Sequence, residues 1–173
     1  MRIFNAIFVV SNSIQSDNMT KNDVLRRLRY TFNFGDDDMI SIFELADVAV
    51  SRAQVSDWLK KDTDEQFRPI PDDQLAAFLN GLIISKRGKK DGPPMPIEKK
   101  LNNNMILRKL KIALNLKDHD MLDLMKLADF NLSKHELSAF FRNPKQSQYR
   151  ECLDQVLRVF LQGLQKQERG ENE

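Results

Sequence analysis

Charged side chains that recur within the chain are the first candidates for chemistry. Three of them return 82 residues later: Arg26 as Arg108, Arg68 as Arg150, and Asp72 as Asp154. An arginine and an aspartate four residues apart can form an ion pair on one helix face, and an arginine can also bind an anion. We interpret these residues as a clamp between the first and last helices of each half, with binding of an anion or a partner protein as the alternative.

Histidine and cysteine, which often serve in catalysis and metal binding, form no constellation in this sequence. His119 and His135 do not recur at the offset, and no cysteine lies near them in sequence. Cys152 takes the position of Ile70, which is typical of a small core residue rather than a nucleophile. We therefore expect no catalytic residue, no metal site and no cofactor.

A duplication of the chain supplies the elements that position these residues. The segment from Asn22 to Gly88 aligns with the segment from Asn104 to Gly170 without a gap. A unit of about 70 residues is near the size at which a single core is only marginally stable, so we expect the two copies to share buried surface. The predicted parts are an extension at 1–18, copy one at 19–88, a linker at 89–101, copy two at 102–170 and a tail at 171–173. We expect the extension to be disordered or to precede a natural start at Met19.

Each copy is predicted to form four helices, because apolar residues recur at helical spacing and no segment alternates as a half-buried strand does. In copy one the first helix is expected from about Lys21 to Asn33, and three aspartates at 36–38 start the second. Capping boxes start the third helix of each copy at Ser51 and Ser133. The last helix of copy two lacks the prolines of its counterpart and is expected to begin early, near Gln148. The predicted fold class is all-α, a tandem of four-helix units that pack together.

Two glycines lie inside predicted helices. Gly81 and Gly163 occupy equivalent positions in the last helix of each copy, where glycine costs about 1 kcal/mol relative to alanine. We expect close helix packing to offset this cost, with the two copies meeting across a pseudo-twofold axis. A ligand groove is the alternative.

The second and third helices of each copy resemble a helix-turn-helix, in which a serine starts the recognition helix. The turn is one residue short and lacks the usual glycine, and Asp57 would face phosphate unfavourably. The candidate nucleic-acid contacts are Arg52 and Lys60 in copy one and Lys134 and Arg142 in copy two.

The charge distribution argues against a phosphate-tracking surface on the folded copies. The chain carries 27 basic and 25 acidic residues, a net charge of +2. Between Ser85 and Lys100, six basic and two acidic residues give +4, which leaves −2 for the rest. The first ten residues are too few to span a bilayer, and a single cysteine fits a reducing compartment, so we expect a cytoplasmic protein without membrane contact.

A bacterial family, the YehS-like proteins, is similar to this chain. The resemblance runs from Met19 to Gly170 and is carried by Asn22-Asp23-Val24-Leu25-Arg26, Ala76-Ala77-Phe78-Leu79-Asn80-Gly81-Leu82-Ile83, Lys86-Arg87-Gly88 and Leu107-Arg108-Lys109-Leu110. These proteins contain one or two copies of the domain of unknown function 1456. The resemblance implies a two-copy bacterial protein and transfers no catalytic residue.

Together these observations predict a helical repeat protein that acts by binding rather than by catalysis. We expect a protein-interaction or regulatory module with a protein partner. Nucleic-acid binding through the second and third helices or the basic linker is the alternative, and an enzyme comes third.

Overall fold

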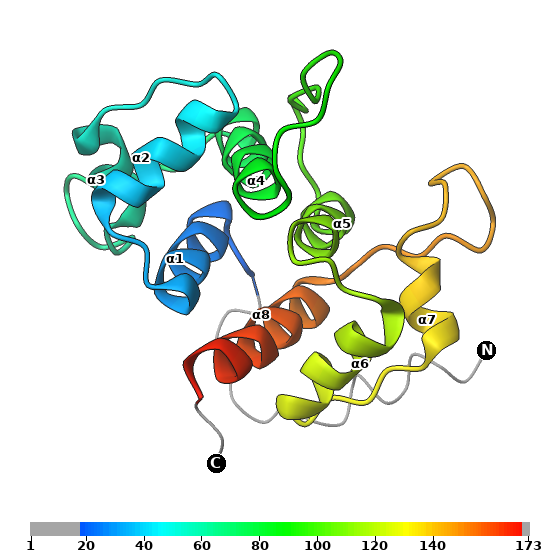
Figure 1. Cartoon of the computed structure of the whole chain (residues 1–173). Coiled ribbons are helices and arrows are strands. Elements are labelled where there is room, and N and C mark those ends of the chain that lie inside the picture. Colours follow the sequence, from blue (N-terminus) through cyan, green and yellow to red (C-terminus); the bar gives the residue numbers. More distant parts are fainter. Residues whose placement is uncertain (1–17, 171–173) are drawn as a thin grey trace.

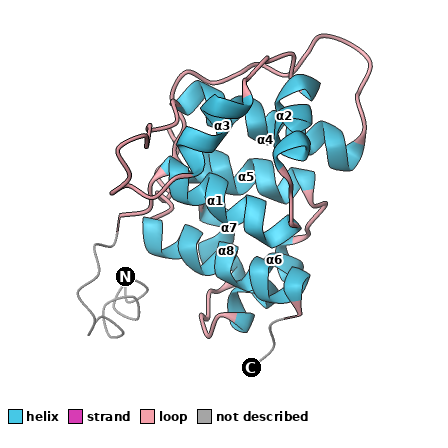
Figure 2. Ribbon diagram, turned by 90° about the vertical axis from the view of Figure 1, so that its left-hand side faces the viewer, coloured by secondary structure: helices cyan, strands magenta, loops and turns pink. Residues whose placement is uncertain are grey.

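The computed structural model describes residues 18–170, and within this range all regular structure is helical (Figures 1 and 2). Residues 1–17 and 171–173, on which the predictions for the extension and tail rest, lie outside the described range. The described helices are α1 (Lys21–Phe32), α2 (Asp36–Leu45), α3 (Arg52–Leu59), α4 (Asp72–Arg87), α5 (Asn103–Ala113), α6 (Asp118–Leu127), α7 (Lys134–Ala139) and α8 (Asp154–Arg169). The all-α prediction of two four-helix copies is confirmed.

Local sequence signals explain most helix starts. Thr20 and Asp23 form a capping box at α1, in which each side chain accepts a hydrogen bond from the backbone N–H of the other. Ser51 and Gln54 do the same at α3. Ser133 caps α7 by accepting a hydrogen bond from the N–H of Glu136.

Four retained polar residues close helices in the left-handed conformation. Asn33 and Asn115 follow α1 and α5 with φ of 55° and 53°, and Asp47 and Asp129 follow α2 and α6 with φ of 59° and 57°. Asparagine and aspartate tolerate this region better than most other side chains. Backbone geometry therefore accounts for the recurrence of Asp47 as Asp129.

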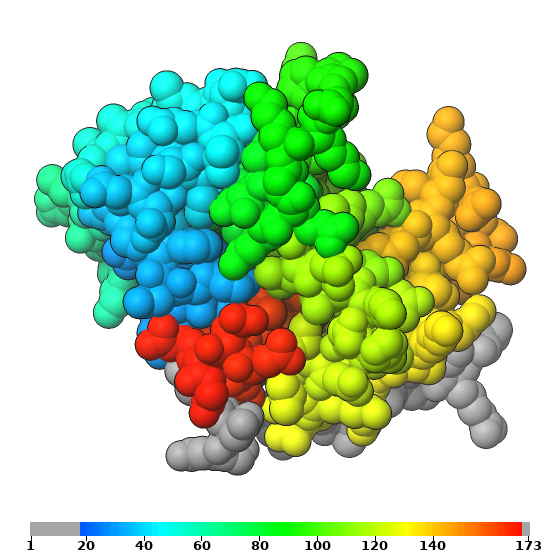
Figure 3. All heavy atoms as spheres, viewed as in Figure 1, coloured from blue at the N-terminus to red at the C-terminus, as the bar shows by residue number. Residues whose placement is uncertain are grey.

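The two copies pair through their first and last helices. α1 packs on α8, and α4 packs on α5, so that each first helix lies against the last helix of the other copy. α2 and α3 flank this four-helix centre on the copy-one side, and α6 and α7 flank it on the copy-two side (Figure 1). The space-filling view shows α8, in red, lying against α1, in blue, without a break between the copies (Figure 3).

α4 and α5 run in the same direction. Near their starts, Asp72 accepts a hydrogen bond from the N–H of Leu101 at 2.8 Å. About two turns further along, Lys109 donates to the side-chain oxygen of Asn80 at 2.6 Å. The chain must therefore return along the whole of α4, whose 16 residues span about 24 Å, before α5 begins. This return explains why the linker is long.

The linker is held where it passes the junction of α4 and α5. The amide of Asn80 donates to the carbonyl of Pro96 at 3.1 Å, and Lys109 forms a 3.0 Å ion pair with Glu98. Lys109 is 8% exposed and is held by Asn80 of α4 and Glu98 of the linker, where α4 packs on α5. A buried ammonium group needs such partners to offset the loss of water.

Gly81 and Gly163 lie at close helix crossings, but within each copy rather than between the copies as expected. A Cβ atom on Gly81 would lie 1.8 Å from the carbonyl oxygen of Ile42 in α2. A Cβ atom on Gly163 would lie 1.8 Å from the carbonyl oxygen of Leu124 in α6. The glycines let α4 and α8 approach the backbone of the flanking helices of their own copy.

The predicted early start of the last helix near Gln148 is wrong, because α8 begins only at Asp154. The N–H of Arg150 donates to the carbonyl of Ala139, and the N–H of Cys152 donates to the side chain of Asn104. These long-range contacts hold the segment in an extended path. Copy two therefore starts its last helix at the same position as copy one, without the prolines.

Candidate functional site

Asn22 and Asn104 form a repeated staple that ties the first helix of each copy to the loop before the last helix. Asn22 donates to the carbonyls of Trp58 and Arg68 at 2.8 and 2.9 Å and accepts from the N–H of Ile70 at 3.1 Å. Asn104 makes the same three bonds, to Phe140, Arg150 and Cys152. Both asparagines are buried. Their recurrence was the sequence signal for this role, which the predicted clamp did not include.

Arg68 and Arg150 do not pair with the aspartates four residues ahead, because α4 and α8 begin at those aspartates. Arg68 donates to the carbonyls of Glu65 and Phe67 in its own loop. Arg150 donates to the equivalent carbonyls of Ser147 and Tyr149. The retained arginines hold the loop before the last helix in its conformation. The predicted ion pair between an arginine and an aspartate on one helix face is not formed.

Asp72 and Asp154 do join helices, but with other partners. Asp72 accepts from the N–H of Leu101 and lies 4.0 Å from Lys21. Asp154 accepts from the N–H of Met19 at 2.9 Å and from the side chain of Asn103 at 2.6 Å. Met19 and Leu101 are equivalent positions, so each aspartate holds the chain that enters the first helix of the other copy.

Arg26 and Arg108 bind the C-terminal end of the third helix in each copy. Arg26 donates to the carbonyl of Lys60 at 2.5 Å, and Arg108 donates to the carbonyl of Phe141 at 2.8 Å. Basic side chains suit these carbonyls, which have no partner within the helix. The clamp at this position therefore connects the first and third helices, not the first and last.

The candidate nucleic-acid contacts are mostly engaged within the protein. Arg52 forms ion pairs with Asp36, at 3.1 Å, and with Asp37. These partners raise the pKa of Arg52, first through the hydrogen bond to Asp37. Lys60 pairs with Asp57 at 2.9 Å. In copy two, Arg142 donates to Gln148 at 2.6 Å, and Lys134 is exposed at the start of α7.

Two equivalent hollows lie between the first and third helices, one in each copy. The copy-one hollow is lined by Arg26, Arg29, Tyr30, Asn33, Phe34, Gly35 and Leu59. The copy-two hollow, with a volume of about 510 Å³, is lined by Arg87, Arg108, Lys111, Ile112, Asn115, Leu116 and Phe141. Six of the seven positions in each list correspond at the offset of 82 residues. The hollows are thus a feature of the repeated unit.

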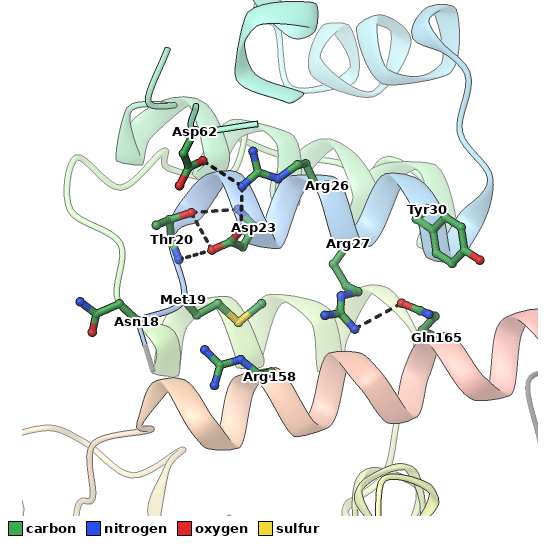
Figure 4. Close-up of a pocket in the computed structure, with 10 residues that line it drawn as sticks. All are labelled: Asn18, Met19, Thr20, Asp23, Arg26, Arg27, Tyr30, Asp62, Arg158 and Gln165. Carbon is green, nitrogen blue, oxygen red and sulfur yellow. Dashed lines mark hydrogen bonds and ion pairs between the residues drawn. The ribbon is translucent and has the colours of Figure 1, made fainter. Parts of the chain in front are cut away.

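Arg26 also lines a neighbouring pocket, drawn in Figure 4, in which two carboxylates lie against its guanidinium. Arg26 lies between Asp23 and Asp62, at 2.6 and 3.3 Å (Figure 4). Burial acts to raise the pKa of Asp23, but hydrogen bonds from Arg26 and Thr20 leave it below the ordinary value. The positive charge of Arg26 is therefore matched by acids of the same copy.

Arg108, the equivalent arginine of copy two, has neither acid beside it. Met105 replaces Asp23 and Pro144 replaces Asp62. Within residues 18–170, Arg108 makes no ion pair, and its hydrogen bond goes to a backbone carbonyl. Lys111 is matched by Asp118 at 2.7 Å and lies over the ring of Phe141. The hollow keeps the arginine and its apolar wall and has no carboxylate on the arginine.

The two copies also differ in their overall charge. Residues 21–88 carry ten basic and twelve acidic residues, a net charge of −2, whereas residues 103–170 carry twelve basic and eight acidic residues, a net charge of +4. The combined charge of −2 outside residues 85–100 therefore concealed a difference between the copies. Copy one and copy two carry net charges of opposite sign.

Cys152 lies in the core and not in either hollow. It is 1% exposed, and burial raises the pKa of its thiol to about 12. A neutral buried thiol is a poor nucleophile. Among the described residues, no helix combines the length and apolar character needed to cross a membrane.

Comparison with known proteins places this duplicated unit. A family described as "Protein of unknown function (DUF1456)" matches the chain twice, at residues 21–88 and 103–170. The chain is 42% identical over 147 residues to "Uncharacterized protein YehS" of Escherichia coli (strain K12), an alignment that covers 84% of this chain and 94% of that protein. No solved structure matches the chain. With both copies matched, the chain belongs to the DUF1456 family.

Proposed function

We propose that this protein binds another protein through the copy-two hollow between α5 and α7 and catalyses no reaction of its own. The observation that carries the proposal is the divergence of two equivalent hollows. In copy one the arginine is matched by carboxylates, and in copy two the equivalent arginine is exposed without them. A partner that supplies acidic groups would complete the second hollow.

The other retained polar side chains hold the fold together, and this leaves them unsuited to catalysis and supports a binding role. The asparagines staple loops, the arginines before the last helices fold those loops, and the aspartates at the starts of α4 and α8 hold the other copy. Caps and left-handed residues account for most of the remainder. No retained pair is left over for acid–base chemistry within residues 18–170.

The form of the hollow suits a macromolecule. It is shallow, and Ile112 at its edge is 47% exposed. Leu116 and Phe141 add apolar surface beside Arg108. Arginine and aromatic or aliphatic side chains together are typical of the residues that carry protein–protein affinity.

A pull-down of tagged protein from its native cells, with and without nuclease, tests the proposal. We expect a stoichiometric protein partner that survives nuclease treatment and is lost from the Arg108→Glu variant. Lys126→Glu, which changes an exposed charge on α6 away from the hollow, is the matched control. If no protein is enriched over the untagged control, the proposal is wrong.

Nucleic-acid binding through the second and third helices or the basic linker is the second candidate. The net charge of +4 on copy two favours it, whereas the ion pairs of Arg52 and Lys60 leave little free charge on α3. Binding of this kind would weaken steeply with added salt, and the pulled-down material would be lost on nuclease treatment. The lone buried thiol supports a reducing compartment, and we propose the cytoplasm as the location.

A further inference from the structure

Copy one forms the full set of contacts around its arginine, and copy two forms only part of that set. In copy one, the guanidinium of Arg26 pairs with two carboxylates and donates a hydrogen bond to one carbonyl. In copy two, Arg108 keeps the carbonyl contact alone. An arginine held in place by one carbonyl but without its carboxylates is a preformed half of a charge-assisted pair.

The loops that carry the two positions have the same backbone, so copy one is a valid template for copy two. The same three N–H to carbonyl bonds form in both loops: Asp64 to Lys61, Phe67 to Asp64 and Arg68 to Asp57 in copy one, and Gln146 to Asn143, Tyr149 to Gln146 and Arg150 to Ala139 in copy two. Pro144 therefore occupies the place of Asp62 on an equivalent path. The two loops therefore differ in their side chains and not in their backbone path.

We infer that Arg108, which borders the copy-two hollow, is a carboxylate site, and that it binds an acidic peptide segment whose Asp or Glu side chain takes the place that Asp23 and Asp62 fill beside Arg26 in copy one. The inference rests on the proposed binding function and names the chemistry of its partner. Arg108 binds the carboxylate, and Arg87, at the rim of the same hollow, adds positive charge. Within the described range, neither arginine is in an ion pair.

An apolar side chain of the same segment has a place beside the carboxylate. Ile112, Leu116 and Phe141 line the hollow next to Arg108. In copy one the equivalent positions are Tyr30, Phe34 and Leu59, which are also apolar or aromatic. The ligand class is thus a protein segment that carries both acidic and apolar side chains. A nucleic acid lacks the second of these.

A probe peptide and a double variant test the inference. The probe is a fluorescein-labelled amphipathic peptide with glutamates on one face and leucines on the other, followed by fluorescence anisotropy with the full chain. Met105→Asp with Pro144→Asp installs the acids of copy one in copy two. We expect saturable binding by the wild-type chain and about tenfold weaker binding by the double variant, because its two added carboxylates occupy Arg108 and also repel the glutamates of the probe.

The controls distinguish a variant that fails to fold from one that folds but has lost the binding site. Arg108→Gln should weaken binding by a similar factor, and Lys126→Gln should leave it within about twofold, which is the scatter expected for a distant exposed charge. Thermal unfolding shows whether each variant is folded. If Arg108→Gln does not fold, the double variant still decides, because it adds side chains that copy one already carries on the same backbone.

Three outcomes overturn the inference. One is equal peptide affinity of the wild-type chain and the double variant. Another is tighter binding of a single-stranded oligonucleotide of the same net charge than of the peptide. The third is a cellular partner that the wild-type chain and the double variant capture equally well, which would support the proposed function while rejecting this site.

Discussion

At the scale of single residues, the asparagine staple is the most consequential side chain in each copy. Asn104 satisfies two carbonyls and one N–H group that no other described side chain reaches. We expect Asn104→Ala to lower the free energy of unfolding by about 2–4 kcal/mol, because buried backbone groups would lose their partners. Urea denaturation measures this loss.

Asn102→Ala is the matched control for the staple. Asn102 caps α5 through one hydrogen bond to the N–H of Met105 and is exposed. Its removal should lower the free energy of unfolding by about 1 kcal/mol. A loss from Asn104→Ala no larger than this would show that water can replace the staple.

The glycines at the helix crossings set a second residue-scale prediction. Gly163→Ala places a methyl group against the carbonyl of Leu124, so α6 and α8 must separate. We expect a loss of more than about 4 kcal/mol in the free energy of unfolding. Gly35→Ala, where the nearest atom to a new Cβ is 3.5 Å away, should change it by about 1 kcal/mol or less. A folded Gly163→Ala chain with a wild-type midpoint in urea would contradict the observed crossing.

The ion pair of Asp118 with Lys111 predicts a pH dependence. The hydrogen bond from Lys111 is the main cause that lowers the pKa of Asp118, against the opposing effect of burial. Because the folded pKa lies below the unfolded value near 3.9, the stabilisation is full above about pH 4 and is lost as the pH falls through the folded pKa. Asp118→Asn should therefore be less stable than wild type at pH 7, by about 1 kcal/mol or less, and equal to it near pH 2. Unfolding at the two pH values measures the difference.

Recurrence in the sequence identified the important polar residues but not their partners. Arg68 and Asp72 were retained for separate reasons, and four-residue spacing suggested a pair only while both were assumed to be helical. The two hollows were not predicted as sites, because residues from the first helix, the third helix and the end of the last helix meet only in the fold. The change of Asp23 to Met105 and of Asp62 to Pro144 was visible in the alignment of the copies and was the signal that could have found them.

At the scale of elements, the sequence predicted the starts of α1, α2, α3 and α7 closely and the start of α8 poorly. Caps and glycines act within a few residues, so Thr20, Ser51 and Ser133 could be read directly. The start of α8 depends on contacts with Ala139 and Asn104, which lie far away in sequence. Helix order was predictable, and the direction in which α4 and α5 pair was not.

The pairing of α4 with α5 predicts that the two copies stay together when the linker is cut. Lys90 and Asp91 are exposed, and a protease site inserted between them should be cleaved without unfolding. We expect the two fragments to remain together in size-exclusion chromatography, because α1 on α8 and α4 on α5 hold the copies by packing. They should separate in urea. Separation in native buffer at micromolar concentration would show that the linker, and not the packing, holds the copies.

At the scale of the whole molecule, the copies depend on each other for burial. Nine successive residues of α4, from Leu75 to Ile83, are buried, which requires cover on all sides of the helix. α2 covers one side and α5 of the other copy covers another. We expect residues 18–88 alone to form no stable monomer, as light scattering after chromatography would show. A folded, monodisperse monomer of this fragment would contradict the shared core.

The fusion of both copies in one chain also determines how many partners a molecule can hold. In an assembly of two identical chains, every substitution is made twice, so both hollows would gain or lose their acids together. Here Asp23 and Asp62 remain in one copy, while Met105 and Pro144 stand in the other. Under the proposed function the molecule would act as a monovalent receptor, which recruits one partner per chain although its two copies share one fold.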